Sequence, residues 1–415
     1  MTTTDAGIAR PWTRRYSESA MGRWAMLIIG MLATASTALL LNGTAFLIPA
    51  LRDQRDMTLA TAGIVIAMPT VGIVFTLIAW GAVVDRIGER LSLTVGSALT
   101  AAAAYCAATT QTTVTLAVFL LLGGMAAASV NSATGRVVVG WFPAHRRGLA
   151  MGIRQMSLPV GVALSALLIP GIARDHGVSS AMLLPAVAST VAALACAVGV
   201  VDPARPSRTA ASSEALLRNP YRGRADLWRI HGASVALVVP QYVVWTFSLV
   251  WLVDQREWSP AAAGVLITVA QVCGAVGRIA VGAVSDRVSS RLGPMRWVAA
   301  SVVTVMLLMA VTDAIGTSAS VVVLVVASVA TVSPNGLAFT AVAERAGPFW
   351  SGRALGAQNT SQFVAASAVP PLFGVLITHT SYPVAFAVSA LIAAVALPVI
   401  PREHAGVDDT GRSTR

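Results

Sequence analysis

The chain has 415 residues, of which 56% are apolar and only 11% are charged, and its formal net charge is +11. Soluble globular domains carry about 25% charged residues, so the composition excludes an ordinary soluble domain and indicates an integral membrane protein. All 29 basic residues are arginine.

Long apolar runs follow one another along the whole chain. A transmembrane helix needs about 20 predominantly apolar residues to cross a hydrocarbon layer about 30 Å thick. We therefore predict an all-α integral membrane fold with twelve transmembrane helices, over residues 24–50, 59–84, 92–110, 113–140, 149–172, 180–201, 231–253, 260–284, 297–315, 318–343, 353–377 and 383–400.

The predicted spans divide into two pseudo-symmetric six-helix bundles, 24–201 and 231–400. The segment between them, 202–230, is rich in Pro, Ser and Arg and is predicted to be a cytoplasmic linker. Residues 1–23 and 401–415 are predicted cytoplasmic tails. No small-residue cleavage site follows a short apolar core, so the first span is predicted to be a retained helix and not a signal peptide.

The arginines predict the orientation in the cytoplasmic (plasma) membrane. With both termini in the cytoplasm, 22 arginines lie in cytoplasmic segments, three lie within spans, and four lie outside: Arg52, Arg55, Arg174 and Arg256. This distribution follows the positive-inside rule. We attribute the net charge to contact with anionic membrane lipids and expect no nucleic-acid partner.

One short charged motif occurs twice, with its first glycines 201 residues apart. The first copy consists of Gly81, Asp85, Arg86, Gly88 and Arg90, and the second of Gly282, Asp286, Arg287 and Arg291, with Ser289 at the position of Gly88. A second echo supports an internal duplication: the segments 141–152 and 349–356 both place aromatic and Arg residues before a helix rich in small residues. Duplicated membrane bundles are typical of transporters that work by alternating access.

With these motifs the whole chain resembles the major facilitator superfamily, as a bacterial twelve-helix type. The resemblance implies two six-helix bundles around a central cavity. The stretch Arg154-Gln155 is weakly similar to the cyanate and nitroimidazole transporter group. The helix-5 run from Leu158 to Val162 lacks the Gly-Pro-x-x-Gly-Gly core of drug antiporters, which disfavours a proton/drug antiporter without excluding it.

The charged motif is interpreted as a conformational latch on the cytoplasmic side. A carboxylate such as Asp85 can cap the N-terminus of a neighbouring helix, and Arg side chains can reach acidic groups or lipid phosphates. Contacts of this kind would form in one state and break in the other. The alternative is an ordinary positive-inside loop with an incidental Asp. The gating residues are predicted to be Gly81, Asp85, Arg86, Gly88, Arg90, Asp286, Arg287 and Arg291.

Polar residues inside the spans are the candidates for substrate binding, because ionisable groups in a membrane are costly. Three are arginines near the cytoplasmic ends of their spans, where snorkelling to the interface is the alternative. The candidates are Arg136, Arg154, Gln155, Asn131, Gln241, Tyr242, Gln271, Arg278, Asn335, Gln358, Asn359 and Gln362.

The charge balance inside the membrane bears on the substrate. No Asp or Glu lies deep in a predicted span, whereas three arginines lie within spans. This favours a small anionic or neutral polar substrate.

We therefore expect a monomeric secondary active transporter that is coupled to protons and is surrounded by membrane lipids. A proton-driven efflux pump for drugs or metabolites is the nearest alternative. A membrane enzyme would need a cluster of nucleophile, base or metal ligands. The sequence offers none, so we expect no catalytic residue, metal or cofactor. A non-transporting sensor would normally carry a sizeable cytoplasmic output domain.

Overall fold

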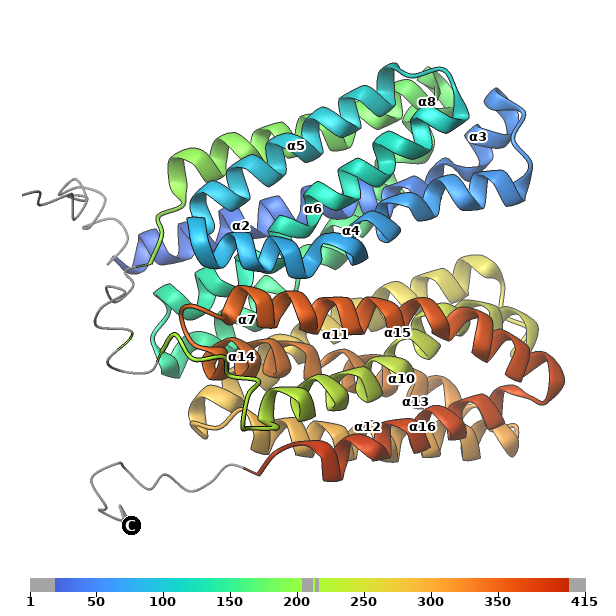
Figure 1. Cartoon of the computed structure of the whole chain (residues 1–415). Coiled ribbons are helices and arrows are strands. Elements are labelled where there is room, and N and C mark those ends of the chain that lie inside the picture. Colours follow the sequence, from blue (N-terminus) through green and yellow to red (C-terminus); the bar gives the residue numbers. More distant parts are fainter. Residues whose placement is uncertain (1–18, 204–211, 213–215, 403–415) are drawn as a thin grey trace, which may run out of the picture. The chain divides into compact units, whose positions relative to one another are not determined.

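A computed structural model describes residues 19–203, 212 and 216–402, and within these ranges the secondary structure is helical without strands (Figure 1). The elements are α2 (Ala20–Leu41), η1 (Gly43–Leu47), α3 (Ile48–Arg55), α4 (Leu59–Ile87), α5 (Glu89–Thr109), α6 (Thr113–Trp141), η2 (Ala144–Arg146), α7 (Arg147–Arg154), α8 (Ser157–Gly199), α10 (Asp226–Asp254), α11 (Pro260–Arg287), α12 (Leu292–Ala314), α13 (Ala319–Val332), α14 (Pro334–Ala346), α15 (Ser351–His379) and α16 (Tyr382–Val399). Most of the predicted tails and part of the predicted linker lie outside the described residues.

The all-helical membrane fold is confirmed. Eleven continuous stretches of the described residues are long and apolar enough to cross a membrane. One of them, Ala144–Gly199, has 56 residues and contains a non-helical residue, Gly177, with φ 87°. The two spans predicted at 149–172 and 180–201 are therefore two helices joined at Gly177.

The side chain of Gln54 holds this junction together. Its Nε2 donates to the Ala173 carbonyl oxygen at 2.7 Å, and its Oε1 accepts from the Val178 amide at 3.1 Å. These are backbone groups that the end of one helix and the start of the next leave without an intrahelical partner. No sequence pattern distinguishes Gln54 from the other polar residues outside the predicted spans.

Two predicted spans are interrupted, and each break coincides with a residue that disfavours a continuous helix. The first span divides at Asn42 into α2 and, after η1, α3, which has Pro49 in its first turn. The tenth divides at Ser333 into α13 and α14, which begins with Pro334. A proline lacks the N–H that a continuous helix would need, and its ring crowds the preceding turn.

The described chain forms two compact units, each of which is considered by itself. Unit 1 comprises the described residues up to Pro143, those from Met156 to Arg218, and Ala346–Thr360. Unit 2 comprises Ala144–Gln155, Asn219–Arg345 and the described residues from Ser361 onward. Packing thus groups 144–155 with the second half of the sequence and 346–360 with the first. The predicted bundles 24–201 and 231–400 did not include this exchange.

Small residues bring the helices of unit 1 into backbone contact. In this unit α4 and α5 pack on α6, and α2 and α5 pack on α8 (Figure 1). A Cβ atom added to Gly72 would lie 2.1 Å from the Leu121 carbonyl oxygen, and one added to Gly124 would lie 2.0 Å from that of Pro69. Such crossings are typical of membrane helices, whose association depends on close packing.

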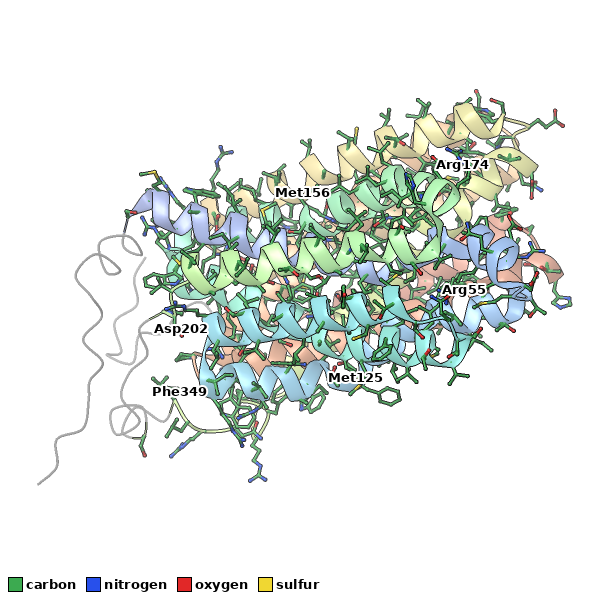
Figure 2. All side chains as sticks on the ribbon, turned by 90° about the horizontal axis from the view of Figure 1, so that it is seen from above. Arg55, Met125, Met156, Arg174, Asp202 and Phe349 are labelled. Carbon is green, nitrogen blue, oxygen red and sulfur yellow. The ribbon has the colours of Figure 1, made fainter. Side chains whose placement is uncertain are left out.

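The two ends of unit 1 carry the residues that the sequence assigned to opposite sides of the membrane. Figure 2 shows Arg55 and Arg174 at one end and Asp202 and Phe349 at the other. Between these ends many large apolar side chains point outward, for example Phe75 at 77% exposure and Leu167 at 75%. An apolar outer surface of this kind is suited to lipid contact and not to water.

In unit 2, α16 packs on α10 and α12, and α13 packs on α10, α11 and α12. The short helix α7 packs on α11. The closest approach is at Gly282, where an added Cβ atom would lie 2.2 Å from the Gly148 carbonyl oxygen.

Candidate functional site

The first charged motif forms a buried ion-pair cluster in unit 1. Asp85, near the end of α4, and Glu89, at the start of α5, both bind the guanidinium of Arg136 on α6. The Arg136 Nε to Glu89 Oε1 distance is 2.7 Å, and the three side chains are 0–4% exposed. Buried charges are tolerated when they are paired and hydrogen-bonded. The cluster thus satisfies Arg136, which the sequence analysis had placed among the substrate-binding candidates.

The same Asp85 carboxylate caps the N-terminus of α15. Its oxygens accept hydrogen bonds from the backbone amides of Gly352 at 2.8 Å and Arg353 at 3.1 Å. The helix dipole and the otherwise unpaired amides of a first turn both favour a carboxylate there. Glycine is required at the crossing, because a Cβ on Gly81 would lie 2.3 Å from the Gly352 carbonyl oxygen.

The remainder of the first motif contacts the end of α8. Gly88, with φ 96°, joins α4 to α5 in a backbone conformation that favours glycine. The Arg90 amide donates to Asp202 Oδ1 at 2.8 Å, and the Arg90 Nε donates to the Ala197 carbonyl oxygen at 2.9 Å. The Arg86 side chain is exposed.

The second motif repeats the capping arrangement in unit 2. Asp286, at the end of α11, accepts hydrogen bonds from the amides of Gly148 at 2.9 Å and Leu149 at 2.8 Å, in the first turn of α7. Arg291 Nη1 lies 2.6 Å from Asp286 Oδ1. Ser289, which replaces the turn glycine, also has a positive φ, 51°. Arg287 is exposed, like Arg86.

Glu344 completes the unit 2 cluster. Its carboxylate lies 3.4 Å from Arg291 Nε and 3.3 Å from Arg147 Nη1. The cluster therefore joins the ends of α11 and α14 to the start of α7 through alternating charges. The contact of Asp85 with α15 and the contact of Asp286 with α7 are equivalent. In each, the Asp of the charged motif caps a helix that begins within one of the two similar segments, 349–356 and 141–152.

A second set of polar residues forms an amide chain in unit 2. Asn335 Nδ2 on α14 donates to Gln241 Oε1 on α10 at 3.0 Å, and Gln362 Nε2 on α15 donates to Asn335 Oδ1 at 3.4 Å. Gln241 is buried, whereas Asn335 and Gln362 are partly exposed. Three helices thus present amides to one another, and their remaining donors and acceptors suit a polar solute.

Two buried arginines lie in the same unit. Arg278 on α11 donates from Nη1 to the Gln155 carbonyl oxygen at 3.0 Å and from Nε to that of Val332 at 3.4 Å. Arg154 Nη1 donates to Gln155 Oε1 at 2.9 Å, and its guanidinium carbon lies 5.8 Å from the Phe339 ring centroid. Within the described residues no carboxylate lies within 4.0 Å of Arg278, whose charge is therefore solvated by carbonyl dipoles.

A model of the Major Facilitator Superfamily matches residues 26–370. An uncharacterised MFS-type transporter of Mycobacterium tuberculosis strain H37Rv is 51% identical over 379 residues, which cover 91% of this chain and 85% of that protein. The chain belongs to the major facilitator superfamily. A second MFS-type relative, from M. tuberculosis strain CDC 1551, is 50% identical over the same length.

Solved structures of superfamily transporters share the fold. The proton:xylose symporter XylE has a TM-score of 0.72 at 13% identity, with 91% of this chain and 96% of that chain covered. The transporter FucP in its outward conformation has a TM-score of 0.70 at 15% identity, with 90% and 97% covered. The human organic anion transporter MFSD10 has a TM-score of 0.70 at 17% identity, with 91% and 99% covered. At these identities the likeness shows the fold alone.

The structure divides the predicted substrate-binding residues of this superfamily member between its two units. Asn131, Arg136, Gln358 and Asn359 belong to unit 1, where the Asn359 amide donates to the Leu355 carbonyl oxygen of its own helix at 2.9 Å. The other eight belong to unit 2: Arg154, Gln155, Gln241, Tyr242, Gln271, Arg278, Asn335 and Gln362. The amide chain and the two arginines make unit 2 the richer candidate site.

The sequence pattern did not single out Glu89 or Phe339. Glu89 lies four residues after Asp85, a spacing that places both near the same turn, but only the fold shows that Arg136 lies between them. Within the described residues there is no group of three His, Cys, Asp or Glu side chains placed to hold a metal ion.

Proposed function

We propose that this superfamily transporter moves a small anionic or neutral polar solute across the plasma membrane by alternating access, coupled to protons. The observation that carries the proposal is Arg278, a buried guanidinium whose described partners are carbonyl oxygens. A carbonyl satisfies an N–H group without neutralising the charge, so an anion can still gain from binding there. Arg154 and the amide chain in the same unit add further polar contacts.

We also propose that the two capped helices act as cytoplasmic latches. The segments 84–91 and 285–296 carry the carboxylates, and the starts of α15 and α7 receive them. Both termini would lie in the cytoplasm, as the arginine distribution predicts. In each contact, the carboxylate and the helix that it caps come from different halves of the sequence. Rocking of the halves would therefore break both contacts together.

Uptake into proteoliposomes tests the transport proposal. The purified protein is reconstituted and given a panel of small labelled anions, neutral polar solutes and lipophilic cations, with and without an imposed pH gradient. We expect an inward proton gradient to accelerate uptake of at least one anion or neutral polar solute. Extrusion of lipophilic cations against that gradient, without anion movement, would instead support a proton-driven efflux pump.

A further inference from the structure

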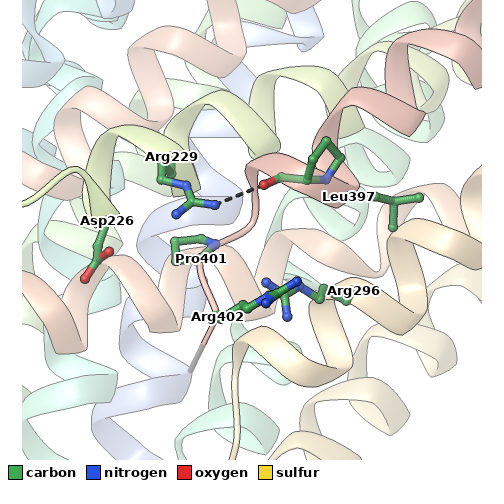
Figure 3. A pocket seen from close by; sticks show the side chains of 7 residues that line it. Asp226, Arg229, Arg296, Leu397, Pro401 and Arg402 are labelled. Atoms are coloured by element: carbon green, nitrogen blue, oxygen red, sulfur yellow. Dashed lines mark hydrogen bonds between the residues drawn. The ribbon is translucent and has the colours of Figure 1, made fainter. Parts of the chain in front are cut away.

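A charged cavity of about 720 Å³ lies in unit 2, where α10 begins and α16 ends (Figure 3). Four charged side chains line it: Asp226, Arg229, Arg296 and Arg402. Its apolar wall is the last turn of α16 and the residues that follow. The volume is within the range of about 300–1,000 Å³ that ligand sites occupy. Arg296 is the last residue of the latch segment 285–296, but its described hydrogen bond goes to the Ile400 carbonyl oxygen and not to a latch carboxylate. The other lining residues lie outside the latch segments and the polar cluster described above.

Two of the arginines are held in place by the end of α16. Arg229 donates from Nε to the Val399 carbonyl oxygen at 2.9 Å and from Nη2 to that of Pro398 at 3.0 Å. Arg296 Nη2 donates to the Ile400 carbonyl oxygen at 2.7 Å. The last carbonyls of a helix lack intrahelical partners and favour cations. Helix α16 therefore positions both guanidinium groups at the cavity.

The bonded arginines keep donor capacity for a ligand. A guanidinium has five N–H groups, and within the described residues these bonds use two of them on Arg229 and one on Arg296. Arg402 is exposed and adds a third guanidinium to the lining. Asp226, whose carboxylate lies 3.8 Å from Arg224, is the single acid among the lining residues. The cavity thus has an excess of positive charge beside one hydrogen-bond acceptor.

The cavity also carries the signature of a membrane interface. Trp228 precedes Arg229 and Trp297 follows Arg296, and each tryptophan side chain is 61% exposed. Exposed tryptophan is enriched at the level of lipid headgroups, where its ring contacts acyl chains and its N–H contacts water. Basic pockets between helices at this level are suited to acidic headgroups.

We propose that this cavity binds the headgroup of an anionic phospholipid that carries free hydroxyl groups. The phosphodiester would receive N–H bonds from Arg229, Arg296 and Arg402, since guanidinium groups match phosphate oxygens. A headgroup hydroxyl would donate to Asp226. The acyl chains would follow the apolar outer surface of α10 and α12. Capping of α16 alone accounts for Arg229 and Arg296, but gives no role to Arg402 or Asp226 as lining residues.

Lipid-dependent thermal unfolding of the full chain in detergent tests this site. Phosphatidylglycerol is titrated into the purified protein, with phosphatidylcholine and soluble glycerol phosphate as separate titrations. The test variant is Arg402→Gln, which leaves the α16 caps in place. Arg222→Gln is the matched control, because it removes an exposed arginine that lies shortly before the start of α10 but does not line the cavity.

We expect phosphatidylglycerol to raise the unfolding temperature in a saturable manner, and phosphatidylcholine and glycerol phosphate to have little effect. Arg402→Gln should weaken the apparent phosphatidylglycerol affinity about tenfold, the size expected for one charged hydrogen bond, while Arg222→Gln should not. Equal stabilisation by phosphatidylcholine, or equal losses in the two variants, would refute the site. Saturation by glycerol phosphate at the same concentration would reassign it to a soluble anion.

Discussion

At the scale of single residues, the Asp85 carboxylate makes two kinds of contact at the same time. It neutralises the buried Arg136 and also caps α15 through the Gly352 and Arg353 amides. If α15 leaves, Asp85 remains paired with Arg136, so neither of these two buried charges is left without a partner. This is a suitable property for a contact that must open repeatedly, because removing one partner of a buried pair outright costs about 3–5 kcal/mol.

Replacement of Asp85 by asparagine tests the latch. Asp85→Asn keeps the side-chain size and one acceptor oxygen but loses the charge that favours the α15 N-terminus. We expect the transport rate to fall about tenfold or more, since a hydrogen bond to a charged group contributes about 1.5–3 kcal/mol, with substrate affinity nearly unchanged. Asp175→Asn, at a carboxylate whose side chain is 55% exposed, is the control. Wild-type turnover by Asp85→Asn would contradict the latch.

Replacement of Arg278 by lysine tests the proposed anion site. A lysine ammonium is a point charge and cannot reproduce the planar guanidinium that donates to both the Gln155 and Val332 carbonyl oxygens. We expect the affinity for an anionic substrate to fall about tenfold, corresponding to about 1.4 kcal/mol, measured as the KM for uptake. Arg222→Lys, at an exposed arginine outside the spans and the latch segments, should leave KM unchanged. Equal KM values for both variants would place Arg278 outside the substrate site.

At the scale of elements, glycine determines where two helices can meet. The α4–α15 contact in unit 1 depends on Gly81 and Gly352, and the α11–α7 contact in unit 2 depends on Gly282 and Gly148. At both crossings backbone atoms take the place that a side chain would fill. The carboxylate caps lie one helical turn further along α4 and α11, so the glycines bring the caps within hydrogen-bonding distance.

A pair of glycine substitutions in α4 separates this contact from general helix effects. A Cβ on Gly81 would meet the Gly352 carbonyl oxygen at 2.3 Å, whereas one on Gly63 has no atom within 4 Å. Gly81→Ala should lower thermal stability by about 1–3 kcal/mol, as overpacking does, and slow uptake. Gly63→Ala should be neutral or stabilising by up to about 1 kcal/mol. The crossing would have no role in transport if both variants showed wild-type uptake.

At the scale of the whole molecule, charge predicts the orientation. The tests are Arg174→Cys, at a side chain that is 78% exposed, and Arg222→Cys, in a background without Cys106, Cys196 and Cys273. A membrane-impermeant maleimide added to intact cells should label the first variant, and should label the second only after permeabilisation. Labelling in the reverse order would overturn the proposed cytoplasmic placement of the termini.

The sequence by itself determined the helical membrane fold, the two copies of the charged motif and the membership of the superfamily. Span prediction works because a bilayer has a fixed thickness and a lipid-embedded backbone must satisfy its hydrogen bonds within its own helix. These are local requirements, so apolar runs report them directly. The breaks at Asn42 and Ser333 were missed although Asn42-Gly43 and Ser333-Pro334 interrupt the apolar runs, because each run is apolar enough over its whole length to be predicted as one span.

The tertiary structure alone decided which charged residues meet. Asp85 and Gly352 are 267 residues apart, and Asp286 and Gly148 are 138 apart. No periodicity in the chain links positions at such separations. The same is true of Glu89 with Arg136, of the amide chain, and of the arginines gathered at the end of α16. A polar residue in a span is recognisable from sequence because its burial is costly, but its partner is chosen by helix packing.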